Sequence, residues 1–290
     1  MSYAKPEQLV ETGWLEEHLE DDRVRILDCN VILTPLEEGG FQLTSGREAW
    51  KSGHIPGSMV ADLTSDLSDP GNSLPLMAPT MERFADAMSR YGVGPETRVI
   101  LYDDFYNMWA ARVWWMLRAV SFSNAAVLNG GWRKWALEHR PISTDIPSFE
   151  PANFPAVRRA NVMATKADVL TEIGKASSCI VNALSPEDHA GTGGMIKYPR
   201  PGRITSSVNV PFATLVDDDT HAYLPAASLR ERFDAVETRG PDRVITYCGA
   251  GIAACSDAFV LTLLGKENVE VYDGSLMEWA AEASLPMEQD

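Results

Sequence analysis

The segment "VITYCGAGIAACSDAFVL" (residues 244–261) is the part of the sequence best suited to covalent chemistry. An apolar, β-branched run ends at Cys248, a glycine-rich turn follows, and a helix is predicted to begin near Ala253. At the end of a buried strand, the thiol would face backbone amides and the positive end of a helix, which both stabilise an anionic sulfur. The residues expected to cradle that sulfur are Gly249, Ala250, Gly251, Ile252, Ala253 and Ala254.

The other three cysteines suggest a different role. Cys29 and Cys179 each lie in a strand-like apolar run and are predicted to be small buried hydrophobes. Cys255 is expected to pack on one helical face, with a resolving thiol as the alternative. Four scattered cysteines do not make a disulfide framework, and no CxxC or His/Cys spacing suggests zinc. We therefore expect no metal or organic cofactor.

The chain repeats itself. Several blocks recur in the same order, with offsets that fall from 154 to 144 residues: "RILD" (25–28) and "CIVN" (179–182), "GHIPGS" (53–58) and "GRITSS" (202–207), "TRVILY" (97–102) and "DRVITY" (242–247), "VLNGGWRKW" (127–135) and "VYDGSLMEW" (271–279). Matched blocks in one order are the signature of a tandem duplication.

Within each copy, strand-like runs alternate with helical patterns. Helices are predicted near 80–92 and 224–237, and a proline-rich stretch separates the copies. This alternation predicts an α/β fold with two tandem domains, each a parallel sheet flanked by helices. The predicted divisions are an N-terminal domain (1–145), a linker (146–160) and a C-terminal domain (161–290).

The duplication allows the two versions of one loop to be compared. Asp103 stands where the second copy has Cys248, and Asp104, Phe105 and Tyr106 follow it. We do not expect such a loop to form an anion cradle. The N-terminal domain is therefore predicted to be catalytically degenerate and structural, with the reactive thiol open in the mouth between the two lobes.

Composition narrows the possible partners. The 290 residues carry 25 Lys+Arg against 41 Asp+Glu, a formal net charge of −16. Such a balance argues against nucleic acid and anionic membranes as partners, because both require a basic face. No apolar run is long enough to span a bilayer, and "MSYAKPEQLVET" lacks the hydrophobic core of a signal peptide. A cytoplasmic location is expected.

Taken together, these motifs resemble the two-domain rhodanese family, the thiosulfate and 3-mercaptopyruvate sulfurtransferases. "GHIPGS" and "VYDGSLMEW" are similar to two family signatures, and "CGAGIAA" is similar to the active loop "CGSGVTA" of the mercaptopyruvate type. The resemblance implies that Cys248 takes a sulfane sulfur from a small anionic donor, thiosulfate or 3-mercaptopyruvate. The resulting persulfide, stabilised by the loop amides, would pass its sulfur to cyanide, a thiol or a thioredoxin-like acceptor.

The match is incomplete at the positions that bind the donor. Ala250 and Ala253 replace the loop hydroxyls, while Leu184 and Asp188 replace the family's arginines in "NALSPEDHAG". Asp188 would repel an anionic donor. The residues that could bind it instead are His54, His189, Lys197, Arg200 and Arg203. The alternatives are that His54 satisfies a backbone group at a turn and that the others are solvated surface charges.

Two other functions suit a cysteine in an amide cradle. A phosphatase or arsenate-reductase-like enzyme needs a C-x5-R loop, with an arginine to grip the oxyanion, but position 254 is alanine. The second is a non-catalytic persulfide carrier or binding module, which the missing loop hydroxyls and arginines favour. Transfer of sulfur from donor to acceptor under turnover distinguishes the enzyme from the carrier.

Overall fold

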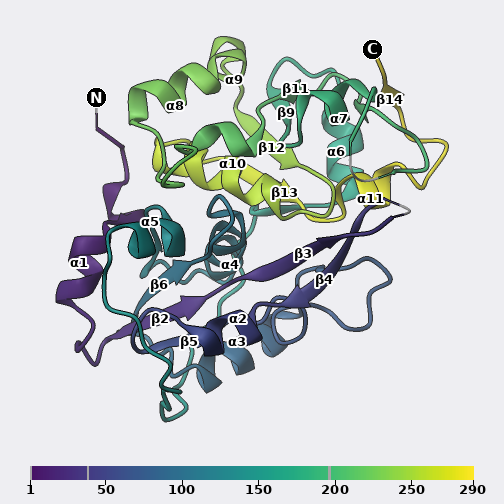
Figure 1. Ribbon diagram of the computed structural model, residues 1–290. Coiled ribbons are helices and arrows are strands. Elements are labelled where there is room, and N and C mark those ends of the chain that lie inside the picture. The colour runs from purple at the N-terminus through teal and green to yellow at the C-terminus, as the bar shows by residue number, and fades with distance from the viewer. Residues whose placement is uncertain (1, 38, 195–196) are drawn as a thin grey trace.

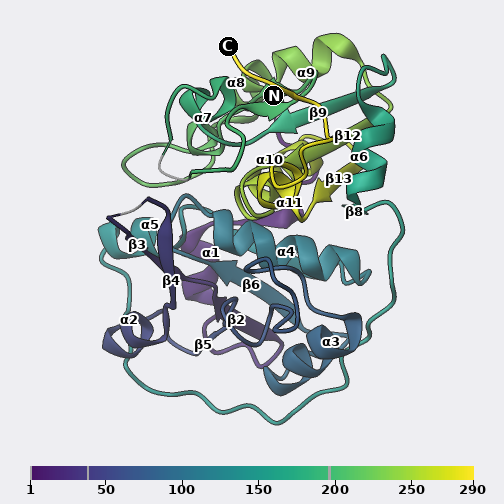
Figure 2. The same ribbon diagram turned by 90° about the vertical axis from the view of Figure 1, so that its right-hand side faces the viewer.

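The computed structural model describes residues 2–37, 39–194 and 197–290. Two five-stranded parallel sheets follow one another along the chain, with the strand orders β1-β7-β6-β2-β5 and β11-β9-β12-β13-β8. Helices flank each sheet, and the two units stack as an N-terminal and a C-terminal lobe (Figures 1 and 2). The predicted α/β fold with two sheet domains is confirmed.

The N-terminal lobe contains β1 (Leu9–Val10), α1 (Thr12–Glu17), β2 (Val24–Asp28), β3 (Val31–Pro35), β4 (Phe41–Ser45), α2 (Arg47–Ser52), β5 (Ser58–Val60), α3 (Met81–Arg90), β6 (Arg98–Tyr102), α4 (Met108–Ala119), β7 (Ala125–Leu128) and α5 (Gly131–Leu137), preceded by the short 3-10 helix η1 (Pro6–Gln8). Strands β3 and β4 form a separate antiparallel hairpin, which the sequence analysis does not predict.

The C-terminal lobe contains β8 (Met163–Ala164), α6 (Lys166–Glu172), β9 (Ser178–Asn182), α7 (Pro186–Ala190), β10 (Arg203–Ile204), β11 (Val208–Asn209), η2 (Phe212–Leu215), α8 (Ala226–Arg232), α9 (Asp234–Arg239), β12 (Arg243–Tyr247), α10 (Ala253–Leu263), β13 (Val269–Tyr272), α11 (Ser275–Trp279) and β14 (Met287–Glu288). Read from its other edge, the main sheet runs β8-β13-β12-β9-β11, which matches the N-terminal sheet strand for strand. The duplication seen in the sequence is thus a duplication of topology.

Local sequence accounts for most of these elements. The centre of each sheet is a buried β-branched strand, β6 or β12, and Thr80 caps α3 by accepting a hydrogen bond from the amide of Arg83. The single helix predicted over 224–237 is instead two helices, α8 and α9. They are separated at Phe233, whose fully buried ring anchors the bend in the core. In the part of the chain that the structure describes, no helix is long and apolar enough to cross a membrane.

The two lobes meet through equivalent parts of the repeat. Helices α4 and α10, which follow the two compared loops, pack against one another (Figure 2). The amide of Ala78 donates to Asp273 Oδ2 at 2.8 Å, and the amide of Tyr223 donates to Asn129 Oδ1 at 2.8 Å. Since 223 − 78 = 145 and 273 − 129 = 144, these contacts correspond within the repeat. The lobes are therefore related by a pseudo-two-fold axis.

Candidate active site

Cys248 follows the last residue of β12, and α10 begins at Ala253, as the sequence predicts. The intervening loop rests on the hydroxyl of Ser275, the first residue of α11. Ser275 Oγ accepts hydrogen bonds from the amides of Cys248 and Gly251, both at 3.1 Å, and donates to the carbonyl of Tyr272 at 2.7 Å. One buried hydroxyl thus ties the two ends of the turn together.

The carbonyls of this loop are bonded to groups outside it. Cys248 O and Gly249 O accept from two amides of α11, each at 3.0 Å. Gly251 O accepts from Arg112 Nη1 at 3.3 Å and from Cys255 Sγ at 3.1 Å. These bonds hold the loop carbonyls away from the sulfur.

The loop amides, in contrast, are largely unused. Among the described residues, no acceptor pairs with the amides of Gly249, Ala250, Ile252 and Ala253. They lie at the turn where a helix begins, so their donor ends add to the positive end of α10. The loop therefore has the donor set needed to hold an anion bonded to Cys248.

The sulfur lies deeper than the sequence predicts. Cys248 is only 2% exposed and belongs to the main apolar core, so the thiol does not stand open between the lobes. Tyr198, on the segment after α7, is close to it: burial and the charge of a Cys248 thiolate both raise the pKa of the Tyr198 phenol. The Tyr198 hydroxyl is buried without a hydrogen-bond partner in the described structure. At this exposure, a reagent from solvent has little direct access to the sulfur.

The equivalent loop of the N-terminal lobe overturns one expectation. Asp103 is buried, and its carboxylate accepts hydrogen bonds from the amides of Phe105 (2.6 Å), Asn107 (3.1 Å) and Ala110 (2.8 Å). This loop does form an anion cradle, and the anion is the side chain of Asp103 itself. The expectation that this loop could not form an anion cradle was wrong, because it did not include a carboxylate bound by the amides of its own loop.

The buried Asp103 predicts a specific pH dependence of stability. Burial raises its pKa to about 7, against the opposing effect of the amides of Ala110 and Phe105. Because the folded pKa exceeds the unfolded value, the contribution of Asp103 to the free energy of unfolding is full below pH 4. It is lost as pH rises toward 7. We compare the thermal unfolding of Asp103→Asn and the wild type at pH 5 and at pH 8. The free energy of unfolding of the variant, relative to that of the wild type, should be about 2–3 kcal/mol higher at pH 8 than at pH 5, which corresponds to about 5–10 °C in Tm. Parallel pH curves for the two proteins would contradict this assignment.

His54 lies within the N-terminal lobe. Its Nδ1 is 2.8 Å from the carbonyl of Trp50, its Nε2 is 2.9 Å from the carbonyl of Asp145, and its ring stacks on that of Trp50. The side chain is fully buried and both ring nitrogens are occupied, so neither nitrogen is available to bind a sulfur donor. These contacts support the alternative in which His54 satisfies backbone groups.

Two of the residues predicted to bind the donor, Arg200 and Arg203, are engaged by the C-terminal segment, and a third, His189, is uncharged. The Arg200 guanidinium donates to four carbonyls, those of Trp279, Ala280, Glu282 and Leu285. Arg203 forms ion pairs with Glu288 and Asp290. Burial and the nearby charge of Arg203 lower the pKa of His189 to about 4, so His189 is neutral at pH 7. These contacts leave none of the three as a free cation.

Lys197 and Asp188 are the two remaining charged residues that the sequence analysis connects with donor binding. Lys197 is exposed, is adjacent in sequence to Tyr198, and has no acidic partner among the described residues. Asp188 accepts a hydrogen bond from Ser185 Oγ at 2.8 Å, and burial raises its pKa. A raised pKa reduces, without removing, the repulsion that Asp188 exerts on an anion.

The remaining thiols are buried. Burial raises the pKa of Cys255 to about 12 despite the nearby Arg112, and its thiol donates to Gly251 O. Burial also raises the pKa of Cys29. Cys179 is fully buried in β9. Within residues 2–37, 39–194 and 197–290, no cluster of three or more His, Cys, Asp or Glu side chains could hold a metal ion.

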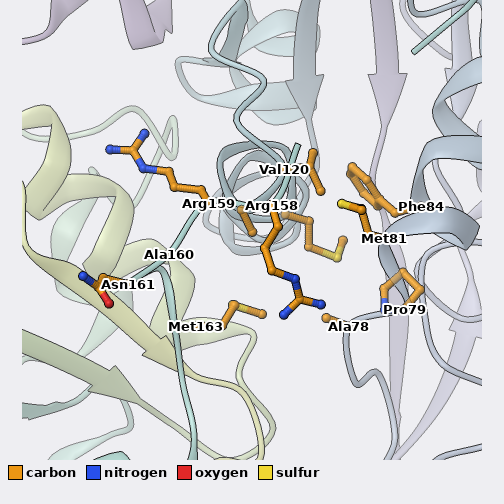
Figure 3. Close-up of a pocket in the computed structure, with 12 residues that line it drawn as sticks. Ala78, Pro79, Met81, Phe84, Val120, Arg158, Arg159, Ala160, Asn161 and Met163 are labelled. Carbon is orange, nitrogen blue, oxygen red and sulfur yellow. The ribbon is translucent and has the colours of Figure 1, made fainter. Parts of the chain in front are cut away.

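A surface groove of about 270 Å³ lies beside the linker rather than over the thiol. Met81 and Phe84 of α3, Met116 of α4 and Met163 of β8 contribute its apolar lining. Arg158 extends across it toward Ala78 (Figure 3). Neither Cys248 nor its loop lines this groove, so it is separate from the candidate active site.

Three residues at this site were not predicted from the sequence. Ser275 lies within the motif "VYDGSLMEW", where a serine at the start of a helix is a detectable signal. Arg112 interrupts the apolar helix α4, but its partners are distant in the sequence, and Tyr198 lies in an irregular segment. Arg112 reaches the loop, and Tyr198 comes close to Cys248, only through the tertiary fold.

The fold and the site define a class: a duplicated α/β protein in which one lobe presents a cysteine in an amide loop and the other presents an aspartate there. Comparison with known proteins agrees. The family model described as rhodanese-like domain matches residues 11–138 and 165–282. The sulfur carrier protein TtuD of Thermus thermophilus is 32% identical over 300 residues, covering 99% of this chain and 98% of that protein.

Two further comparisons extend this result. Thiosulfate sulfurtransferase of Bos taurus is 30% identical over 284 residues, covering 93% of this chain and 91% of that protein. The crystal structure of SseA from Escherichia coli, described as a 3-mercaptopyruvate sulfotransferase, matches with a TM-score of 0.79 and 27% identity, covering 92% of this chain and 98% of that chain. The chain belongs to the rhodanese family and is a sulfurtransferase.

Proposed function

We propose that Cys248 accepts a sulfane sulfur from a small anionic donor and passes it to a thiophilic acceptor. The observation that carries this proposal is the loop of the N-terminal lobe. There, amides at Phe105 and Asn107 bind the Asp103 carboxylate. With the 145-residue offset, the equivalent amides are those of Ala250 and Ile252, which have no acceptor among the described residues. A Cys248 persulfide would supply the anion that Asp103 supplies in the other lobe.

The chemistry is a double displacement. The Cys248 thiolate attacks the outer sulfur of thiosulfate, the S–S bond of the donor breaks, and sulfite leaves with the bonding electron pair. With 3-mercaptopyruvate the C–S bond breaks instead, and the leaving carbon takes a proton to give pyruvate. An acceptor such as cyanide or a thiolate then attacks the terminal sulfur and restores the Cys248 thiolate. Throughout, the loop amides stabilise the negative charge.

The donor is a small anion in this proposal. Arg200 and Arg203 are held by carbonyls and carboxylates, so the exposed Lys197 is the cation we assign to donor recruitment. The N-terminal domain, proposed as residues 1–145, carries no sulfur because its cradle is filled by Asp103. The acceptor is a small thiol or a thioredoxin-like protein, and the cytoplasmic location stays a prediction.

The test is sulfur loading followed by release. The full chain is incubated with thiosulfate or with 3-mercaptopyruvate, and its intact mass is measured before and after addition of cyanide. We expect one added sulfur atom on the peptide that contains Cys248, with loss of that mass and formation of thiocyanate on addition of cyanide. Comparison of the steady-state rates then identifies the preferred donor. No added sulfur with either donor would contradict the proposal.

A second function, that of a sulfur carrier, is favoured by the absence of the family's loop hydroxyls and arginines. The similarity to a protein named as a sulfur carrier points the same way. The same experiment separates the two functions. A carrier would hold the added sulfur stably and give no repeated thiocyanate formation with either donor, whereas an enzyme turns over many times.

A further inference from the structure

A buried arginine of the N-terminal lobe contacts the Cys248 loop. Arg112 lies on α4, and its side chain has no exposed surface. It crosses the interface between the lobes and donates to Gly251 O at 3.3 Å, while its other terminal nitrogen donates to Leu76 O at 3.0 Å. Arg112 Nη1 also forms a 2.6 Å ion pair with Asp273 Oδ1. One guanidinium thus contacts the loop, the residue after β13 and its own lobe.

This charge is fixed in place. Burial by itself lowers the pKa of Arg112, but the Asp273 carboxylate and, to a smaller extent, Cys255 together outweigh it and the net pKa is raised, so the side chain remains a cation. The second carboxylate oxygen of Asp273 accepts the amide of Ala78. A buried ion pair is costly unless other bonds satisfy its remaining atoms. Both lobes contribute such bonds here, and Arg112 Nε is the guanidinium nitrogen left without a partner in the described structure.

The pseudo-two-fold axis provides an internal comparison. The position equivalent to Arg112 is Asp257 on α10, since 112 + 145 = 257, and the position equivalent to Asp273 is Asn129. Asp257 is fully buried, neither of its carboxyl oxygens has a hydrogen-bond partner in the described structure, and burial raises its pKa. A guanidinium therefore contacts the Cys248 loop, whereas the equivalent position on the other side of the interface holds a carboxyl group without hydrogen bonds.

We propose that Arg112 is a positioning residue for the sulfur-carrying loop, supplied by the lobe that carries no sulfur. By binding Gly251 O, it keeps that carbonyl turned away from Cys248, so that the neighbouring amides face the sulfur. Its charge also favours an anion on the loop. The role in sulfur transfer rests on the proposed function, whereas the effect on the thiol does not.

The test measures the thiol directly. The rate of alkylation of Cys248 by iodoacetamide is followed by peptide mass between pH 5 and pH 10 in the wild type, Arg112→Gln, Arg112→Lys and Asp257→Asn. The titratable or charged groups around Cys248 and its loop include Arg112, Asp273, Cys255, Tyr198, Tyr247 and Asp188, and these single variants change none of them except Arg112. We expect Arg112→Gln to shift the alkylation curve to higher pH and to slow the reaction about tenfold at pH 7. Arg112→Lys should stay near the wild type, and Asp257→Asn should match it.

Folding is controlled separately, because Arg112→Gln leaves Asp273 buried and unpaired. The double variant Arg112→Gln/Asp273→Asn removes both charges, and near-UV circular dichroism identifies the variants that are folded. A folded neutral variant with the wild-type curve, or an equal shift in Asp257→Asn, would overturn the proposal. So would failure of both neutral variants to fold, which would assign Arg112 to the fold alone. A shifted curve without sulfur loading in the wild type would leave this inference standing and refute the proposed function.

Discussion

Cys248→Ser is expected to reduce the rate of sulfur transfer by about a thousandfold or more, while the fold is retained. A serine hydroxyl is not ionised near neutral pH and cannot form a persulfide. The substitution changes the side chain by one atom and preserves the bond from the residue 248 amide to Ser275 Oγ. Thiocyanate formation and intact mass after exposure to donor provide the measurement, with circular dichroism to verify the fold.

The matched control is Cys255→Ser. Cys255 is also buried, and its thiol donates to Gly251 O, a bond that a serine hydroxyl can replace. This variant should keep most of the activity. Sulfur transfer at the wild-type rate in Cys248→Ser would refute the assignment of the nucleophile, and a large loss in Cys255→Ser would make that thiol a partner in the reaction.

Gly251→Ala is expected to reduce sulfur loading at least about a hundredfold in a protein that still folds. Gly251 has a φ of +72°, and a Cβ there would lie 2.6 Å from Asp273 Oδ1 and 2.7 Å from the Asp273 carbonyl oxygen. Because the backbone at Asp273 cannot yield easily, the loop must move, and the amides then no longer converge on the sulfur. A displacement of about 1 Å is enough to cost two orders of magnitude in rate.

Gly174→Ala separates this steric effect from the cost of the backbone conformation. Gly174 has a φ of +75°, but a Cβ there would meet no atom within 4 Å. Its replacement should cost about 1 kcal/mol of stability and leave sulfur loading unchanged. Equal loading by the two variants would show that the fit of Gly251 against Asp273 does not set the loop geometry.

The fold could be predicted because its determinants are local and occur twice. Buried β-branched strands such as β6 and β12 are readable as short apolar runs, and the recurring blocks show that both copies share one topology. The Cys248 loop could be predicted for the same reason: strand end, glycine turn and helix start are consecutive in the sequence. The hairpin of β3 and β4 was missed because nearly all of its side chains are partly or fully exposed, and only β4 alternates regularly along its length.

The partners of the site could not be predicted, because they depend on contacts between distant segments. Arg112 and Asp273 are 161 residues apart, and only the packing of α4 against α10 brings them together. In the sequence Arg200 resembles a free cation, because the four carbonyls that bind it lie about 80 residues later, in the C-terminal segment. For Asp103, the repeat identified the correspondence with Cys248, but the sequence did not show that the side chain points back to the amides of its own loop.

The depth of Cys248 bears on its chemical durability. A thiolate open to solvent is oxidised by peroxide through sulfenic to sulfinic acid, and the later steps are irreversible. A sulfur that is 2% exposed meets peroxide only when the covering side chains part. The cover that restricts access of a sulfur donor therefore restricts access of peroxide as well, and we expect both reactions to depend on the same movement of side chains.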